Sequence, residues 1–182
     1  MENRKLVDRV NIYFKAIDTM ESDFRQSSGA DGNISVGTFQ IARSGKFKFE
    51  YLSSPKSVFI SNGGAITYYD IELDEISVIP SSKMPIVFLL NGQLGLEELG
   101  AEILQASCSE DNCTIAAKII VDGENYRVEY VFDREIKNLI EIDIVADGAQ
   151  KIYLELSNTR INTALEKGIF IFKNPRIYKK RK

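Results

Sequence analysis

The sequence contains no histidine, no tryptophan and only two cysteines among its 182 residues. Without histidine, neither a Ser-His-Asp triad nor a Cys-His pair can be assembled, so these common arrangements for nucleophilic catalysis are excluded. Two cysteines without histidine also fall short of the ligand set of a structural zinc site. No glycine-rich loop of the phosphate-binding kind is present. We therefore expect a protein that is not an enzyme and that needs neither a metal nor a cofactor.

Long apolar runs and strong net charge are missing as well. No stretch approaches the 18 or more apolar residues of a membrane span. Residues 1–10, MENRKLVDRV, lack the apolar centre of a secretory signal, which was either never present or has been removed. The formal net charge is −3, so nothing at the level of the whole chain attracts nucleic acid. Nothing indicates a symmetric interface, so we expect a monomer whose 182 residues form a single domain.

What the sequence does contain is regular alternation. Residues 3–19 repeat apolar side chains every three or four positions, which predicts an amphipathic helix. Most of the remaining chain alternates apolar and polar residues and is punctuated by turn sequences such as NGG at 62–64, the pattern of antiparallel strands joined by hairpins. The predicted strands are 20–26, 34–43, 46–52, 58–61, 65–69, 75–79, 113–121, 125–132, 137–145, 150–157, a strand or turn at 160–163, and 168–173.

The alternation is interrupted at residues 81–103, SSKMPIVFLLNGQLGLEELGAEI. Pro85 can open a short helix that ends near Gly92, and a second helical piece is expected from 96 to about 100. This insert contains more apolar residues than is usual for an exposed surface loop without a function. The predicted fold is α+β, in which about ten antiparallel strands in meander order form a curled sheet. The N-terminal helix and the insert cover the apolar face of that sheet.

Aromatic residues are concentrated on one predicted face of the sheet. Residues 37–51 read GTFQIARSGKFKFEY, and the alternate positions that begin at 39 are apolar apart from one arginine. The pattern leaves two interpretations open, an ordinary core under the N-terminal helix or a cavity for an apolar ligand, because both require an apolar concave face. The candidate lining residues are Phe39, Ile41, Phe47, Phe49 and Tyr51, followed by Phe59 and Tyr68 on the next strands.

Arg43 is the arginine in this apolar set. A guanidinium among apolar side chains must find acceptors, because an unpaired buried charge is costly. One interpretation is a salt bridge at the rim of the sheet. The other is a latch, in which the N–H donors of Arg43 hold backbone carbonyls of a lid formed by 81–103, since the last four carbonyls of a helix lack intrahelical partners.

Cys108 and Cys113 lie five residues apart in the sequence SCSEDNC. In a reducing cytosol the two side chains would be free thiols, whereas in an oxidising compartment they could close a hairpin loop as a disulfide. The sequence alone leaves both states open.

The order of these segments resembles that of the LolA family, the periplasmic carriers of outer-membrane lipoproteins. GTFQIARSGKFKFEYLSSP resembles the family's G-x-apolar-x-apolar-x-Arg-Pro-Gly-x-aromatic-x-aromatic segment, with Ser44 in place of the proline and Phe49 where tryptophan is common. SVFISNGGAITYYDIELDEISVIP resembles its strand, turn, aromatic strand and Asp-rich turn, and the opening helix with MESDFRQ resembles its helix and Phe-x-Gln strand. PIVFLLNG stands where the family has a lid helix, and GIFIFKNP resembles its closing Phe-x-Phe-x-x-Pro.

The resemblance spans nearly the whole chain and implies a half-open, incomplete antiparallel β-barrel of about ten to eleven strands, covered by the N-terminal helix and a mid-chain helical lid. It implies a hydrophobic cavity for lipoprotein acyl chains, and it implies that Arg43 bonds the lid backbone until cargo enters. It also implies a periplasmic location, with the signal peptide removed, and transfer of lipoproteins from the inner-membrane ABC transporter LolCDE to the outer-membrane acceptor LolB. The lid residues in this interpretation are Ile86, Phe88, Leu89 and Leu90.

Three alternatives to a lipoprotein carrier remain. The chain could be a related binding module for a fatty acid or glycolipid, a LolB-like acceptor, or an adaptor domain whose aromatic face is a filled core. A LolB-like chain is expected to begin with a lipidated cysteine, whereas this sequence begins with Met1 and has no cysteine before Cys108. A polarity-sensitive fluorescent fatty acid separates the adaptor from the others, because it binds a cavity and ignores a packed core.

Overall fold

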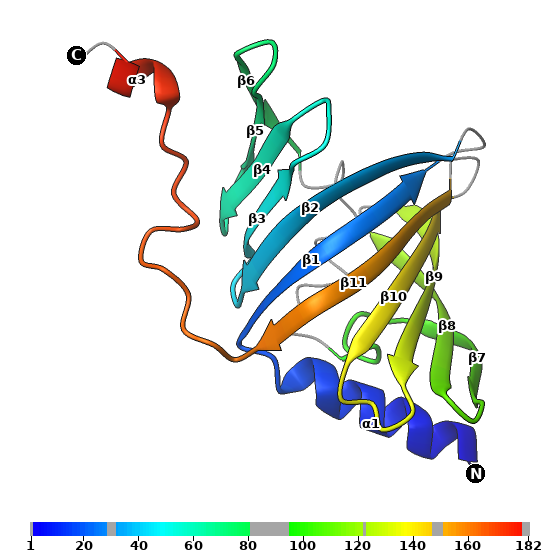
Figure 1. The fold of residues 1–182 in the computed structure, drawn as a ribbon. Helices are drawn as coiled ribbons and strands as arrows, with labels where there is room; N and C mark the ends of the chain where they lie inside the picture. Colours follow the sequence, from blue (N-terminus) through cyan, green and yellow to red (C-terminus); the bar gives the residue numbers. More distant parts are fainter. Residues whose placement is uncertain (1, 29–31, 81–94, 122, 147–150, 180–182) are drawn as a thin grey trace.

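The computed structural model describes residues 2–28, 32–80, 95–121, 123–146 and 151–179 (Figure 1). Eleven strands form one antiparallel sheet in the order β6-β5-β4-β3-β2-β1-β11-β10-β9-β8-β7, and two helices are assigned in the described residues. The helices are α1 (Glu2–Lys15) and α3 (Pro175–Lys179). The strands are β1 (Thr19–Ser28), β2 (Asn33–Ala42), β3 (Lys46–Tyr51), β4 (Ser57–Asn62), β5 (Ile66–Asp70), β6 (Glu75–Ile79), β7 (Glu102–Cys108), β8 (Asn112–Val121), β9 (Glu124–Asp133), β10 (Leu139–Ala146) and β11 (Lys151–Ile161).

The sheet consists of two meanders, β1 to β6 and β7 to β11. They are joined where β1 pairs with β11, from Met20 opposite Ile161 to Ser28 opposite Ile152. β6 and β7 follow one another among the strands but form the two edges of the sheet, so the sheet is not closed into a barrel. This arrangement confirms the predicted open antiparallel sheet of about ten to eleven strands.

Helix α1 covers one face of the sheet, which we call the inner face. The side chains of Leu6, Val10 and Phe14 repeat along one side of the helix and are buried, as the spacing predicts. The ring of Phe14 lies edge-on to that of Tyr130 on β9, with centroids 5.2 Å apart. Figure 1 shows α1 running across one end of the curved sheet from the start of β1 toward β7. No helix within the described ranges is long and apolar enough to cross a membrane.

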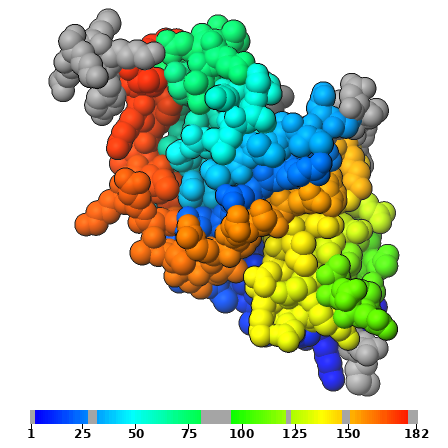
Figure 2. Space-filling model, viewed as in Figure 1, coloured from blue at the N-terminus to red at the C-terminus, as the bar shows by residue number. Residues whose placement is uncertain are grey.

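The prediction of a strand at 168–173 was wrong. This segment instead forms turns, with Ile169 N bonded to Glu166 O and Ile171 N bonded to Gly168 O. It lies against the outer face of the sheet, where the ring of Phe172 is 5.8 Å from that of Tyr69 on β5. Figure 2 shows this orange-to-red segment along the side of the molecule formed by the cyan and green strands.

Three further details differ from the sequence prediction. β7 was not predicted, and β11 continues to Ile161 and so includes the start of the segment predicted at 160–163. Residues 96–100 form successive turns rather than a helix, closed by bonds such as Leu99 N to Gly95 O at 3.2 Å. The short helix predicted from Pro85, together with the lid residues Ile86, Phe88, Leu89 and Leu90, lies outside the described residues.

Candidate functional site

A row of aromatic side chains crosses four neighbouring strands on the inner face. Phe39 on β2 lies opposite Phe49 on β3, Phe49 lies opposite Phe59 on β4, and Phe59 lies opposite Tyr68 on β5. Ring centroids are 5.1 Å apart for Phe39 and Phe49 and 4.7 Å apart for Phe59 and Tyr68. The side chains of Phe39 and Phe49 are 0% and 1% exposed, whereas Phe59 and Tyr68 are half-buried. The row therefore runs from fully buried rings on β2 and β3 to half-buried rings on β4 and β5, toward the β6 edge of the sheet.

A second set of inner-face contacts surrounds Tyr51. Its ring lies 5.1 Å from that of Phe24 on β1, and Phe24 lies directly over Gly37. A Cβ atom at position 37 would come within 2.2 Å of the Glu50 backbone oxygen and within 2.6 Å of the Phe24 ring, so only glycine fits here. The Tyr51 hydroxyl donates to Gln26 Oε1 at 2.8 Å, and burial raises the pKa of Tyr51 to about 12. Tyr51 thus combines an apolar ring contact with a satisfied polar end.

All seven predicted lining residues lie on the inner face of adjacent strands. Ile41 and Phe47 face each other across β2 and β3 and are 2% and 3% exposed. The sequence prediction missed Phe24 and the inner face of β9, although the alternation in NYRVEYVF at 125–132 marks that face. The inner residues of β9 are Tyr126, Val128, Tyr130 and Phe132, and all of them are buried.

Arg43 lies on the turn after β2 rather than within the strand, so the prediction that the strand extends through this residue was wrong. Its side chain is 41% exposed, and Nε pairs with the carboxylate of Asp18. Nη2 donates to the backbone oxygen of Lys15 at 2.7 Å. Lys15 is the last residue of α1, and its carbonyl has no intrahelical partner, so the guanidinium both satisfies that carbonyl and faces the negative end of the helix dipole.

Arg43 therefore forms a salt bridge at the rim of the sheet, and it ties the β2–β3 turn to the end of α1. This is the first of the two interpretations left open by the sequence. Residues 81–94, which hold most of the predicted lid, lie outside the described residues, so a bond from Arg43 to the lid stays a prediction.

The described part of the predicted lid insert is held against α1. The backbone N–H of Leu96 donates to Asn11 Oδ1 at 2.7 Å in a buried position. Lys15 Nζ lies 2.7 Å from Glu98 Oε1. The hydrogen bond from Lys15 lowers the pKa of the Glu98 carboxyl, and the same bond raises the pKa of Lys15. Residues 95–98 thus contact the last two turns of the helix that Arg43 holds at its C-terminal end.

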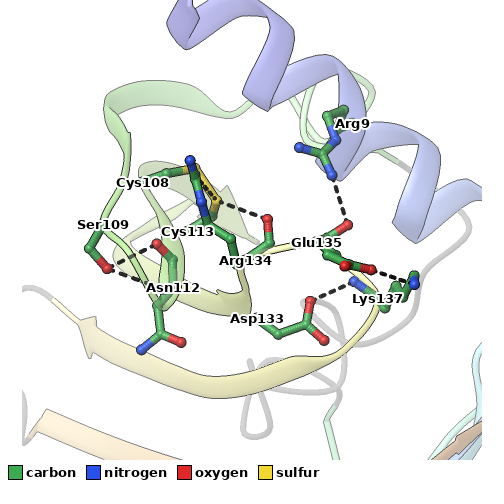
Figure 3. Close-up of a disulfide and its surroundings, with 9 residues drawn as sticks. All are labelled: Arg9, Cys108, Ser109, Asn112, Cys113, Asp133, Arg134, Glu135 and Lys137. Atoms are coloured by element: carbon green, nitrogen blue, oxygen red, sulfur yellow. Dashed lines mark hydrogen bonds and ion pairs between the residues drawn. A yellow bond between two sulfur atoms is a disulfide. The ribbon is translucent and has the colours of Figure 1, made fainter.

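Cys108 and Cys113 lie opposite each other across β7 and β8 and are joined by a disulfide (Figure 3). The Cys113 side chain is fully buried, and Arg134 Nη1 lies 3.7 Å from its sulfur. Figure 3 also shows Arg9 reaching from α1 to the neighbouring turn, where its Nη2 donates to Glu135 O at 2.7 Å. The disulfide closes the edge hairpin β7–β8, and the Arg9 bond holds the β9–β10 turn to α1.

Comparisons with known proteins agree with the architecture. Residues 15–173 match the family model "Outer membrane lipoprotein carrier protein LolA". An outer-membrane lipoprotein carrier protein from Methylococcus capsulatus is 24% identical over 175 residues, which cover 92% of this chain and 83% of that protein. One from Albidiferax ferrireducens is 24% identical over 182 aligned positions, covering 91% of this chain and 85% of that protein.

Among solved structures, a LolA superfamily protein from Nitrosomonas europaea aligns with a TM-score of 0.52 at 6% identity, covering 93% of this chain and 97% of that one. At this identity the likeness concerns the fold alone, whereas the family model covers most of the sequence. The chain therefore belongs to the LolA family of outer membrane lipoprotein carrier proteins.

Proposed function

We propose that this protein carries acylated lipoproteins by enclosing their acyl chains against the aromatic inner face of β2 to β5. The observation that carries the proposal is the cross-strand row from Phe39 to Tyr68, which lies on the inner face of an open sheet in a chain of the LolA family. Its relatives from two bacteria are named outer-membrane lipoprotein carrier proteins. Carriage of this kind needs no catalytic step, no metal and no nucleotide bound to the carrier itself.

The energetics of acyl-chain burial support a carrier that alternates between a closed and a loaded form. Burial contributes about 0.8 kcal/mol per methylene, so a chain of roughly fifteen carbons gains ~12 kcal/mol. Such a gain would prevent release unless a closed form competed with the cargo. The contacts between Phe39 and Phe49 contribute to that competition, because an acyl chain must displace part of the packing of these buried rings before it can lie on this face. The half-buried edge at Phe59 and Tyr68 is the proposed point of entry.

The second part of the closed form is the Arg43 contact. Because Arg43 joins the β2–β3 turn to the end of α1, any opening that moves this helix away from the sheet must break its bond to the backbone oxygen of Lys15, while the pair with Asp18 holds the guanidinium in place for that bond. We place the latch at this contact, and the predicted bond from Arg43 to the lid at 81–94 belongs to the same proposal. In this proposal, the inner-membrane transporter LolCDE loads the protein and LolB accepts the cargo. The protein would then act in the periplasm and carry lipoproteins from the inner to the outer membrane.

The proposal can be tested by the release of newly made lipoproteins from spheroplasts, with this protein as the only soluble acceptor. The expected result is lipoprotein in the supernatant, bound to the protein. Phe59→Glu places a charge in the row and should abolish release, while Val78→Glu, on the outer face of the edge strand β6 where the side chain is 69% exposed, is the matched control. If nothing is released while a fluorescent fatty acid still binds, the cargo is another apolar ligand. If neither occurs, the carrier proposal fails.

A further inference from the structure

A pocket between α1 and the edge strand β7 is lined by three cations. Its volume is about 470 Å³, and its wall includes the first turns of α1, residues 106–108 of β7 and Arg134 on the β9–β10 turn. Lys5 and Arg9 reach it from α1, where they lie one turn apart. Among the described residues that line it there is no aspartate or glutamate. We call this space, with its three cations, the basic pocket.

The two arginines of the basic pocket are held in place by partners without charge. Arg9 Nη2 donates to Glu135 O at 2.7 Å, and Arg134 Nη1 lies 3.7 Å from the Cys113 sulfur (Figure 3). Each contact uses one of the five N–H donors of a guanidinium, and neither side chain forms another hydrogen bond within the described part of the chain. Most donors of both arginines therefore stay free to bind a ligand at the pocket wall.

No carboxylate of the described residues neutralises these cations. Asp133 accepts from the backbone N–H of Lys137 at 2.8 Å and from Asn138 Nδ2 at 2.6 Å, and Glu135 pairs with Lys137. None of the three cations belongs to an ion pair found in the described ranges. Residues 81–94, the longest segment outside those ranges, contain no acidic residue. The basic pocket thus keeps its positive charge in a chain whose net charge is −3.

The shape and charge of the basic pocket favour an anion. Three like charges around one space repel one another, and an anion between them removes that repulsion. The buried side chains of Leu6 and Ala106 form an apolar part of the wall, and the disulfide at Cys108 forms another. A cleft that has walls of low polarity and charges of one sign focuses the electric field and concentrates counter-ions. We therefore expect a ligand with more than one negative charge.

We propose that the basic pocket binds the phosphate group of a phosphate monoester. A guanidinium can donate two parallel N–H bonds to phosphate oxygens, and the lysine adds a compact charge. A phosphate monoester carries about 1.5 to 2 negative charges at neutral pH, which suits three cations better than the single charge of a carboxylate. The volume is typical of a small-molecule site, so we expect an ester rather than the bare ion. This site is separate from the aromatic row, and the inference does not depend on the proposed function.

The test titrates inorganic phosphate and glycerol 3-phosphate into the intact protein and follows the amide NMR signals of Ser107 and Cys108, which line the pocket. The double variant Lys5→Gln, Arg134→Gln should bind both compounds about 10- to 25-fold more weakly, since each exposed ion pair contributes a factor of about three to five. Binding to the wild type should weaken as sodium chloride is added. Arg9 is left unchanged because its bond to Glu135 O also joins the β9–β10 turn to α1.

The matched control is the double variant Lys118→Gln, Arg127→Gln. It removes the same charge from two exposed side chains that face each other across β8 and β9, outside the basic pocket, and it should bind phosphate as the wild type does. Sedimentation with phosphatidylcholine vesicles, with and without phosphatidic acid, separates the two sources of the monoester. Retention on phosphatidic acid vesicles alone assigns a lipid headgroup. Binding of glycerol 3-phosphate without retention assigns a soluble ester, and both results support the inference.

Three results would overturn the inference. The first is a wild type whose Ser107 and Cys108 signals do not respond to either phosphate compound and which phosphatidic acid vesicles do not retain. The second is an equal loss of binding in the two double variants, because net charge rather than the pocket is then responsible. The third is binding of a polyglutamate peptide but of no phosphate, which assigns the pocket to an acidic protein. The fluorescent fatty acid should bind both double variants normally, so the carrier proposal is tested by a separate probe.

Discussion

Replacing Arg43 with leucine removes the side chain that holds the β2–β3 turn to the end of α1. The change deletes the ion pair to Asp18 and the bond from Nη2 to Lys15 O, and it leaves the carbonyl at the helix end to solvent. The side chains of Arg43 and Asp18 are 41% and 70% exposed, so the ion pair itself contributes only about 0–1 kcal/mol. The bond to the helix carbonyl adds about 1 kcal/mol, so the whole contact stabilises the closed form by roughly 1–2 kcal/mol.

Loss of 1–2 kcal/mol shifts the balance between the closed and open forms about 5- to 30-fold. If cargo must displace the closed form, Arg43→Leu should bind a fluorescent fatty acid with an affinity higher by a similar factor. The same variant should take up lipoproteins normally but deliver them poorly to LolB-containing vesicles, because the closed form no longer competes with the cargo. Binding is measured by fluorescence titration, and delivery by sedimentation of the vesicles with their lipoproteins.

Asp18→Asn is the matched control for this prediction. It removes the ion pair but retains the bond from Arg43 to the helix end, so its effect on affinity should be at most a few-fold. Transfer to LolB vesicles at the wild-type rate by Arg43→Leu refutes the latch, whatever its affinity. Equal effects in the two variants would show that charge alone matters, and the bond to Lys15 would then have no role in closing the protein.

Three further predictions concern packing, the disulfide and pH. Gly37→Ala should lower the free energy of unfolding by about 1–3 kcal/mol in urea titrations, because the added Cβ would lie 2.2 Å from the Glu50 backbone oxygen and 2.6 Å from the Phe24 ring. Reduction of the disulfide in the β7–β8 hairpin should cost about 2 kcal/mol, as expected for a loop this short, and the urea midpoint with and without reductant measures it. The Lys15–Glu98 pair should persist from the ordinary carboxyl pKa up to the ordinary lysine pKa. It should be lost only as pH falls through the lowered pKa of Glu98 or rises through the raised pKa of Lys15, visible in the amide NMR signals of residues 95–98 and absent in Glu98→Gln.

Most strands could be predicted from the sequence because one face of each is buried and the alternation is then obligatory. β7 was missed because its pairing with β8 shifts register between Ile103 and Gln105. The extra residue, Leu104, is 45% exposed and interrupts the period of two that marks a strand. The segment 168–173 alternates like a strand but pairs with no strand in the described part of the chain. Alternation indicates which side of a segment is apolar, and it does not indicate whether a neighbouring strand supplies hydrogen bonds.

The join between β1 and β11 could not be predicted for a related reason. Alternation fixes the face of each strand and hairpin turns fix the nearest neighbours, but the pairing of Met20 with Ile161 connects residues 141 positions apart and no local signal specifies it. The contacts within the candidate site could not be predicted either, because they also depend on strand register. Tyr51 and Tyr130 both occupy inward positions of alternating strands, and only the register that places Gln26 beside Tyr51 distinguishes a satisfied phenol from an unsatisfied one.

The aromatic row also suggests how a carrier can bind long acyl chains and still release them. In the closed form that we propose, the ring of Phe39 packs on that of Phe49 and the ring of Phe59 packs on that of Tyr68, and aromatic pairs of this kind are worth about 0.5–1.5 kcal/mol each beyond the area they bury. An entering chain replaces contacts between rings with contacts between rings and methylenes. Loss of the two ring pairs opposes binding by about 1–3 kcal/mol, which offsets a part of the ~12 kcal/mol gained when about fifteen methylenes leave water. In the mechanism that we propose, these ring pairs and the exposed Arg43 contact, worth roughly 1–2 kcal/mol, act together in favour of release.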